Sequence, residues 1–236
     1  MSKISDFLDK IHDAAPTPLG FGADRSEKSP GLGLFGKISK PTKQKLSALE
    51  NTVDGIIFLT DPAEQLILEI STPWMVLAPA DPDGKYIEEL VKKGCDGIQC
   101  DLNAKVSAIT NDDISIFLSI EGEYDWNKLM VINTLPVDGY VIQSENIEPL
   151  SLKQLSMIGS ITRSTDKYCL LNIQQVPSDT ELDALRKVGV MGLIVNSEEL
   201  TGTEIKKLKT SLIDMPNPNH KKKQRPQIKS VFEIEE

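Results

Sequence analysis

One lysine and two carboxylates stand at or near the ends of short apolar segments, where they could do chemistry together. Lys37 lies near the end of such a segment at 32–38, and Asp101 and Glu121 each follow another one. A lysine can bind a carboxylate or activate a carbonyl group, and two carboxylates can act as acid and base or bind a divalent cation. Lys37, Asp101 and Glu121 are therefore the candidate catalytic residues.

Amide and hydroxyl side chains accompany these three residues at alternate positions of the same and other apolar segments. Alternate residues of a strand point to the same side, so these polar groups share one face while apolar neighbours take the other. We interpret them as groups that orient a substrate. They are Ser39, Gln99, Ser119, Gln143, Asn172, Gln174 and Asn196. The alternative is a self-satisfied polar plug, in which Lys37 pairs with Asp101 or Glu121 for structural reasons.

A repeated phrase identifies the elements that position these residues. Asp-Gly stands before an apolar segment at 54–55, 96–97 and 138–139, and Met191-Gly192 is a looser fourth copy. A recurring phrase of this kind indicates a repeated supersecondary unit. One more strand-like segment precedes each copy, namely 32–38, 74–78, 114–120 and 168–173.

Eight strands that alternate with helical patterns predict βαβ units and a parallel sheet. The length of 236 residues is close to the ~250 that a (β/α)8 barrel needs. We therefore predict the α/β class and a single (β/α)8 TIM barrel, with an open doubly wound sheet as the alternative. In such barrels the active site lies at the carboxyl ends of the strands, where the candidate residues cluster. The Asp-Gly pairs precede their strands, so they are expected to serve stability.

Helix boundaries and flanks complete the predicted organisation. Ser178-x-x-Glu181 and Thr201-x-x-Glu204 are capping boxes, and Asp61-Pro62 indicates another helix start with Asp61 as the cap. The weakest helices are expected at 103–109 and 124–131. Three regions follow: an N-terminal helix and Pro/Gly-rich loop at 1–31, the barrel at 32–215, and a flexible tail at 216–236 that is basic, then acidic, and expected to be disordered.

Charge and composition limit the partners. A net charge of −9 argues against nucleic acid as the main partner. No segment has the length and apolarity of a membrane span or a signal peptide. The three cysteines provide neither a disulfide framework nor the spacing of a zinc site. We therefore expect a cytoplasmic protein. The two histidines, His12 and His220, lie in the flanks, which disfavours histidine catalysis and histidine-ligated metal. Asp101 and Glu121 would suit Mg²⁺ or Mn²⁺, but no cofactor is assigned.

Residues 172–200 resemble strands seven and eight of phosphate-binding TIM barrels such as indole-glycerol-phosphate synthase and thiamin-phosphate synthase. The resemblance rests on Asn172-Ile-Gln-Gln, a capped helix and Gly192-Leu-Ile-Val-Asn-Ser. It implies a divergent member of this group, with a phosphate held on backbone N–H groups of the two turns. The sequence has Gln174-Gln175-Val176 in place of the Gly-rich turn and Asn196-Ser197-Glu198 in place of Gly-Ser.

These features favour a small-molecule enzyme of lyase, aldolase or isomerase type that acts on an anionic or carbonyl metabolite. We also expect that the chain can form a homo-oligomer. One alternative is a barrel that has lost catalysis and serves as a binding or interaction protein. Another is a flavin- or nucleotide-binding barrel that uses a loop at 31–36, where Gly31-x-Gly33-x-x-Gly36 matches a dinucleotide fingerprint as a string.

Overall fold

A computed structural model describes residues 2–12, 30–121, 126–143 and 150–215. Eight parallel strands form a closed barrel in sequence order, and β1 pairs with β8 to complete it. The predicted (β/α)8 fold is confirmed, and the pairing of β1 with β8 rules out the open sheet. The strands are β1 Gly33–Ile38, β2 Gly55–Phe58, β3 Trp74–Leu77, β4 Gly97–Cys100, β5 Ser115–Glu121, β6 Gly139–Gln143, β7 Tyr168–Ile173 and β8 Gly192–Asn196.

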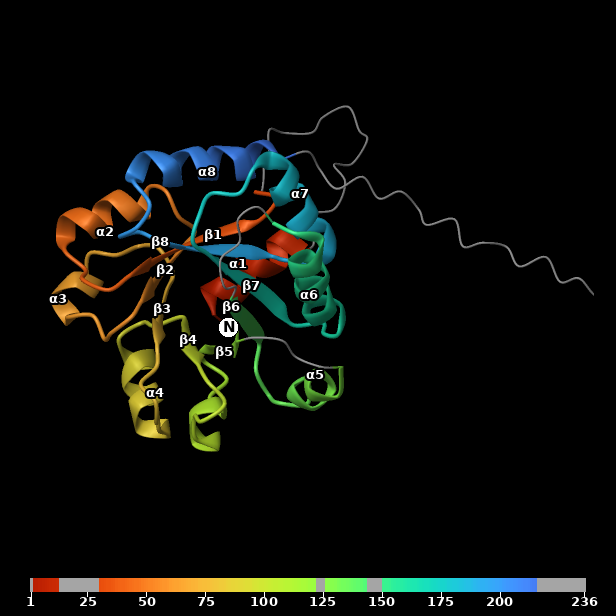
Figure 1. The fold of residues 1–236 in the computed structure, drawn as a ribbon. Helices are drawn as coiled ribbons and strands as arrows, with labels where there is room; N and C mark the ends of the chain where they lie inside the picture. Colours follow the sequence, from red (N-terminus) through yellow and green to blue (C-terminus); the bar gives the residue numbers. More distant parts are fainter. Residues whose placement is uncertain (1, 13–29, 122–125, 144–149, 216–236) are drawn as a thin grey trace, which may run out of the picture.

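Helices surround the barrel as a ring (Figure 1). A short 3-10 helix, η1, follows β4, where a weak helix was expected, but the seven-residue α5 that follows β5 is longer than the four-residue α3. The ring consists of α2 Lys43–Glu50, α3 Glu64–Ile67, α4 Gly84–Lys92, η1 Val106–Ile109, α5 Trp126–Ile132, α6 Leu152–Arg163, α7 Asp179–Val188 and α8 Gly202–Asp214. Both predicted capping boxes are present at the starts of α7 and α8.

The prediction for Asp61 as a helix cap is wrong. The helix α3 begins at Glu64, and its N-cap is Ala63, whose backbone is extended and whose side chain makes no cap hydrogen bond. Asp61 lies two residues before this N-cap. Its carboxylate instead accepts a hydrogen bond of 2.6 Å from the hydroxyl of Tyr86, which links the loop after β2 to α4.

Two apolar cores follow from the alternation of side chains along the strands. The outer core lies between the strands and the surrounding helices. The inner core fills the barrel, and each strand except β4 contributes one large apolar side chain to it. These side chains are Phe35, Ile57, Met75, Phe117, Val141, Leu170 and Ile194. The barrel interior is therefore packed, as is usual for this fold.

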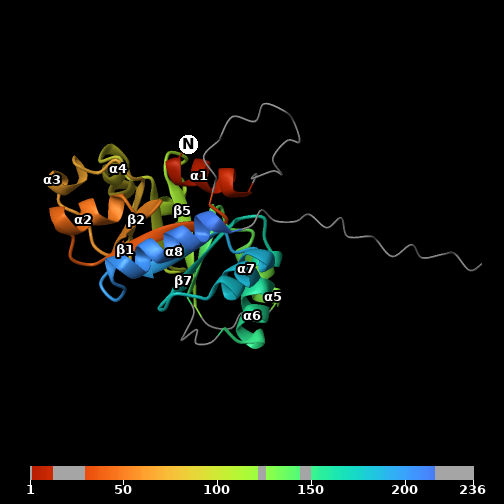
Figure 2. The same ribbon diagram turned by 90° about the horizontal axis from the view of Figure 1, so that it is seen from above.

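The N-terminal helix α1, Lys3–His12, closes one end of the barrel (Figure 2). Ile4 and Leu8 are buried and belong to the inner core. Two polar contacts fix the helix to the starts of strands: Ser5 hydrogen-bonds to Ser115 at 2.6 Å, and the hydroxyl of Tyr168 donates to Asp9 at 2.6 Å. The sequence placed this helix in a flank outside the barrel, whereas it covers the amino-terminal end and completes the core.

The Asp-Gly repeat has a structural role at the same end. Each aspartate accepts a hydrogen bond from a backbone N–H at the start of the preceding strand, which links neighbouring strands. The pairs are Asp54 with Leu34 at 2.9 Å, Asp96 with Trp74 at 3.2 Å and Asp138 with Ile116 at 2.7 Å. The glycine that follows leaves room for an inner-core ring, because a Cβ on Gly55 would lie 2.7 Å from Phe35.

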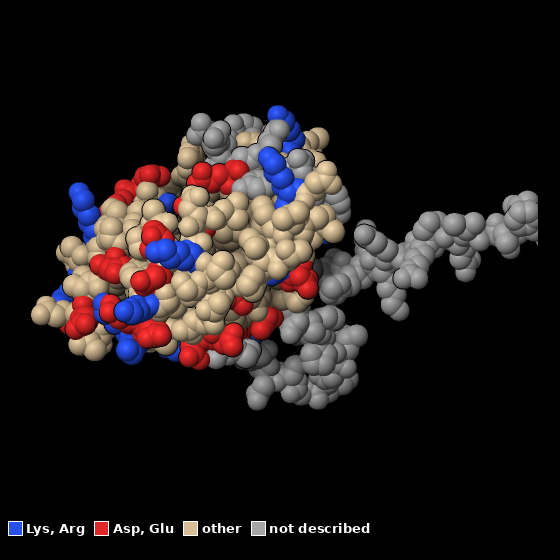
Figure 3. Space-filling view, turned by 90° about the horizontal axis from the view of Figure 1, so that it is seen from below, with Lys and Arg blue, Asp and Glu red and all other residues tan. Residues whose placement is uncertain are grey.

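The loop at 13–29 and the tail at 216–236, with the predictions made for them, lie outside the described residues. Within the described part of the chain, no helix has the length and apolarity needed to cross a membrane. Figure 3 shows acidic side chains with basic ones among them over one face of the molecule. This mixture fits the net charge of −9.

Candidate functional site

The polar side chains predicted from the sequence form the layer above the inner core. On β1 and on β5 to β8, the residue two positions after the inner-core side chain is polar and again points to the barrel axis, whereas Leu59 and Leu77 hold this position for β2 and β3. Lys37 follows Phe35 in this way, and Asn172 follows Leu170. We call this layer, at the carboxyl ends of the strands, the polar mouth. It consists of Lys37, Gln99, Ser119, Gln143, Asn172 and Asn196.

Two pairs of side chains within the polar mouth are joined by hydrogen bonds. The amide of Asn172 donates to that of Gln143 at 2.8 Å, and these residues are register partners on β7 and β6. The amide of Gln99 donates to the hydroxyl of Ser119 at 2.8 Å, and Gln99 is buried. An amide carries two donors and two acceptor sites, so each pair keeps groups that could bind a ligand.

Lys37 is half-buried, and its amine makes no hydrogen bond or ion pair with any residue that the structure describes. Its backbone is fixed, because its carbonyl accepts hydrogen bonds from the N–H of Ser197 at 3.0 Å and from the hydroxyl of Ser197 at 2.8 Å. The interpretation as a polar plug required an ion pair between Lys37 and Asp101 or Glu121. The described part of the chain contains no such pair.

Asp101 and Glu121 are exposed at the rim of the polar mouth. Asp101 accepts a hydrogen bond of 2.7 Å from the backbone N–H of Asn103. Glu121 ends β5 and is the register partner of Gln143. Among the described residues, no three His, Cys, Asp or Glu side chains are grouped so that they could hold a metal ion. These two carboxylates by themselves do not form the Mg²⁺ or Mn²⁺ site considered from the sequence.

Three of the predicted residues lie at or just beyond strand ends: Asn196 ends β8, Ser39 follows β1 and Gln174 follows β7. The amide of Asn196 donates to Glu199 at 2.7 Å and accepts from the N–H of Glu198 at 3.1 Å, so it stabilises the turn that follows β8. The hydroxyl of Ser39 donates to the carboxylate of Glu198. Gln174 is exposed after the end of β7. Asn196 and Ser39 are thus already engaged by the chain itself.

Lys45 is a residue of this region that the sequence did not single out, and Glu198 was named only as part of the departure from Gly-Ser. Besides Ser39, the carboxylate of Glu198 contacts the amine of Lys45 at 3.2 Å. The hydroxyl of Ser39, then the amine of Lys45, hold the pKa of Glu198 below its usual range. The departure from Gly-Ser at 196–198 was the signal that could have pointed to Glu198. Its partners could not be found in this way, because Ser39 and Lys45 lie far from it in the sequence.

The three cysteines do not contribute a nucleophile to the polar mouth. Cys95, Cys100 and Cys169 are free and buried. Cys100 lies between Gln99 and Asp101, but it points outward into the core between strands and helices. Burial raises its pKa to about 11, so this thiol stays protonated at neutral pH.

The glycines of the string Gly31–Gly36 do not form a phosphate-binding loop. β1 begins at Gly33, so most of the string is strand. A Cβ on Gly33 would lie 2.9 Å from Phe7 of α1, and one on Gly36 would lie 3.1 Å from Leu49. These glycines allow close packing, which removes the feature on which the flavin or nucleotide hypothesis rested.

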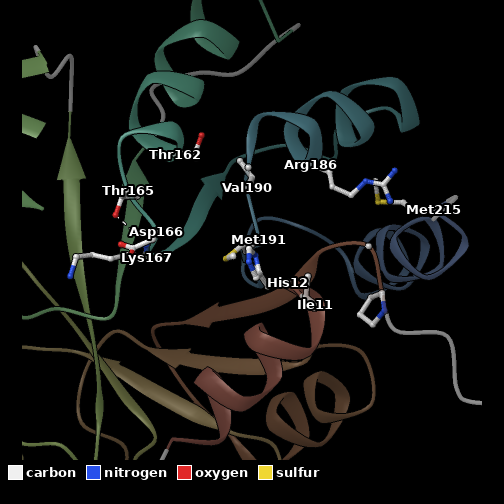
Figure 4. Close-up of a pocket in the computed structure, with 13 residues that line it drawn as sticks. Ile11, His12, Thr162, Thr165, Asp166, Lys167, Arg186, Val190, Met191 and Met215 are labelled. Carbon is white, nitrogen blue, oxygen red and sulfur yellow. Dashed lines mark hydrogen bonds between the residues drawn. The ribbon is translucent and has the colours of Figure 1, made fainter. Parts of the chain in front are cut away.

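A cavity of about 290 Å³ lies at the opposite end of the barrel, between the end of α1 and the turns that precede β7 and β8 (Figure 4). Its cationic lining residues already have partners. The amine of Lys167 donates to the carbonyl groups of Leu135 and Val137 at 3.0 and 2.6 Å, and Arg186 pairs with Asp183 at 2.9 Å. None of the candidate residues from the sequence lines this cavity.

Comparisons with known proteins bear on the fold. No protein-family model and no curated protein sequence matches the chain. Its structure is similar to that of KGPDC from Streptococcus mutans, with a TM-score of 0.62, 15% identity, and coverage of 77% of this chain and 97% of that chain.

Two further structures are similar over nearly their whole length. A mutant tryptophan synthase alpha-subunit from Pyrococcus furiosus gives a TM-score of 0.59 at 15% identity, covering 78% of this chain and 97% of that one. Phosphoribosyl anthranilate isomerase from Thermococcus kodakaraensis gives a TM-score of 0.56 at 14% identity, covering 78% of this chain and 98% of that one. The expected resemblance to other TIM barrels is thus confirmed at the level of the fold.

Proposed function

We propose that the chain is a small-molecule enzyme whose active site is the polar mouth, and that its ligand carries a carboxylate or carbonyl group. The observation that carries this proposal is the half-buried amine of Lys37, which has no partner among the described residues. Partial burial of an ammonium group is costly unless an anion or hydrogen-bond acceptor compensates it. A bound carboxylate or carbonyl oxygen would supply that acceptor.

The neighbouring side chains suit the orientation of such a ligand. The pairs Gln143–Asn172 and Gln99–Ser119 offer amide and hydroxyl groups without adding charge. Lys37 therefore determines the sign of the charge that the inner part of the polar mouth prefers. In this role Lys37 binds the carboxylate or polarises the carbonyl, and the amides fix the rest of the molecule.

Asp101 and Glu121 take the acid and base roles in the proposed reaction, which is of lyase, aldolase or isomerase type. Both lie at the exposed rim and neither pairs with Lys37, so they would act on ligand atoms directed outward. The similar structures support a small-molecule enzyme, because their names describe a subunit of tryptophan synthase and an isomerase of phosphoribosyl anthranilate.

The test is a thermal-shift screen with small carboxylates and carbonyl compounds on the parent protein, Lys37→Met and Lys85→Met. Lys85 is an exposed lysine of α4 and serves as the matched control. A ligand at 100 times its Kd stabilises by about 2.7 kcal/mol, which raises the Tm of a chain of this size by roughly 5–10 °C. We expect that shift in the parent and in Lys85→Met but not in Lys37→Met. A ligand that stabilises Lys37→Met as much as the parent would contradict the proposal.

A barrel that binds a metabolite without converting it is the second candidate. The position of Asp101 and Glu121 favours it, because both carboxylates are exposed and no acid–base pair is assembled beside Lys37 in the described structure. Asp101→Asn and Glu121→Gln separate the two functions. An enzyme would lose turnover in these variants and keep its ligand, whereas for a binding protein no turnover of the bound compound is detected even in the parent.

A further inference from the structure

Two donors, one just after β1 and one in the first turn of α2, converge on the carboxylate of Glu198. The hydroxyl of Ser39 donates to Oε2, and the amine of Lys45 lies 3.2 Å from Oε1. A hydroxyl and an ammonium group are donor types that bind phosphate and sulfate oxygens in proteins. We call these donors of Ser39 and Lys45 the anion niche.

The anion niche lies beside the polar mouth. The turn that carries Glu198 is joined to the end of β1, because Ser197 donates two hydrogen bonds to the carbonyl of Lys37. Ser39 is only two residues beyond Lys37, just after the end of β1. Lys45 belongs to the first turn of α2, whose helix begins after the N-cap Thr42, so the positive end of this helix also faces the niche region.

An anion that is part of the chain has a strong advantage over one in solution. A group tethered by a short turn has an effective concentration in the millimolar range or above, so it competes well with free anions. Asn196 strengthens this advantage, since its side chain accepts the N–H of Glu198 and donates to Glu199, which holds the turn in place.

We propose that Glu198 is a specificity-determining residue: its carboxylate occupies the anion niche, so the polar mouth admits a ligand whose anionic group is met by Lys37 and excludes one that would place a phosphate on Ser39 and Lys45. The statement about the mouth's ligand rests on the function proposed above. The occupation of the niche by Glu198 can be tested without that ligand. Removal of the carboxylate leaves these two donors without their acceptor, and a free oxyanion then takes its place.

The probe is inorganic phosphate, titrated into the full-length protein at low ionic strength and followed by isothermal titration calorimetry and by 31P line broadening. The variants are Glu198→Ala, which empties the niche, and Glu198→Gln, which keeps the side-chain shape and removes the charge. Glu199→Gln is the matched control, because Glu199 lies in the same turn and contacts Asn196 rather than Ser39 or Lys45. Circular dichroism checks that each variant is folded.

We expect phosphate to bind Glu198→Ala at least about tenfold more tightly than it binds the parent or Glu199→Gln, with Glu198→Gln between them. Adding Lys45→Met to Glu198→Ala is expected to abolish that gain, whereas adding Lys37→Met leaves it unchanged. Equal phosphate affinity in the parent and in both Glu198 variants would overturn the proposal, as would a gain that survives Lys45→Met. The two proposals can also fail separately. If phosphate binding rises in Glu198→Ala but small carboxylates stabilise Lys37→Met as much as the parent, the anion niche stands and only the proposed function is refuted.

Discussion

The carboxylate of Asp138 accepts a hydrogen bond of 2.7 Å from the backbone N–H of Ile116, across the starts of β6 and β5. Asp138→Ala removes the acceptor of this partly buried N–H. The loss of such an acceptor costs about 1–3 kcal/mol of unfolding free energy. Urea denaturation of the variant measures this cost directly.

Asp112→Ala is the control for that measurement, since Asp112 is exposed in the loop before β5. Its unfolding free energy is expected to stay within about 0.5 kcal/mol of the parent. If Asp138→Ala is no less stable than Asp112→Ala, the recurring aspartates do not stabilise the barrel.

Gly55 and Phe35 form a second pair whose fit can be tested. A Cβ on Gly55 would lie 2.7 Å from the ring of Phe35, while the nearest backbone atom, the carbonyl oxygen of Pro73, is 3.5 Å away. Gly55→Ala should therefore cost about 1–3 kcal/mol through overpacking against one ring. Phe35→Leu removes ring atoms, so the double variant should lose less stability than the sum of the two single variants.

The double-mutant cycle between these two changes is expected to give a coupling energy of about 0.5–3 kcal/mol. Gly202→Ala is the control, because a Cβ at this first residue of α8 meets nothing within 4 Å. Strict additivity of Gly55→Ala and Phe35→Leu would show that the glycine is needed for another reason than the ring.

Leu8 tests the place of α1 in the barrel. Its side chain is fully buried in the inner core, so Leu8→Ala removes apolar contacts and leaves a cavity. We expect a loss of about 2–5 kcal/mol of unfolding free energy, compared with less than about 0.5 kcal/mol for the exposed Lys10→Ala on the same helix. A small effect of Leu8→Ala would mean that α1 does not close the barrel in solution.

The buried thiols predict a loss of stability at alkaline pH. Burial raises the pKa of Cys95 and Cys169 to about 12 and that of Cys100 to about 11, from an ordinary value near 9.0. Below pH 9 the thiols are protonated in both the folded and the unfolded state, so their contribution is constant. Above pH 9 only the unfolded chain ionises, so each thiol lowers the unfolding free energy by about 1.4 kcal/mol per pH unit until its folded pKa is reached.

Urea denaturation between pH 8 and pH 11 measures this slope, and Cys169→Ala should reduce it by the share of one thiol. In the folded protein the three thiols should also react with a thiol-specific reagent at pH 8 far more slowly than in denaturant. Rapid labelling of the native protein would show that these cysteines are accessible, against their burial in the structure.

The sequence by itself determined where the strands lie and which of their side chains face the barrel axis. The Asp-Gly phrases mark the starts of β2, β4 and β6, and the predicted segment 168–173 coincides with β7. The alternation of Phe117, Ser119 and Glu121 also predicted which residues point to the barrel axis. These features are local, because a strand repeats every two residues and a turn is specified by its own few residues.

Only the tertiary structure decided the partners of these side chains. The pairing of Gln143 with Asn172 depends on the register of β6 and β7, and the inner-core position of Leu8 depends on closure of the barrel around it. The contact of Glu198 with Ser39 joins residues 159 positions apart. Periodicity shows the side to which a side chain points, but hydrogen bonds and packing between distant segments depend on how the strands close into a barrel. The closure of β1 onto β8 is what brings Glu198 to Ser39.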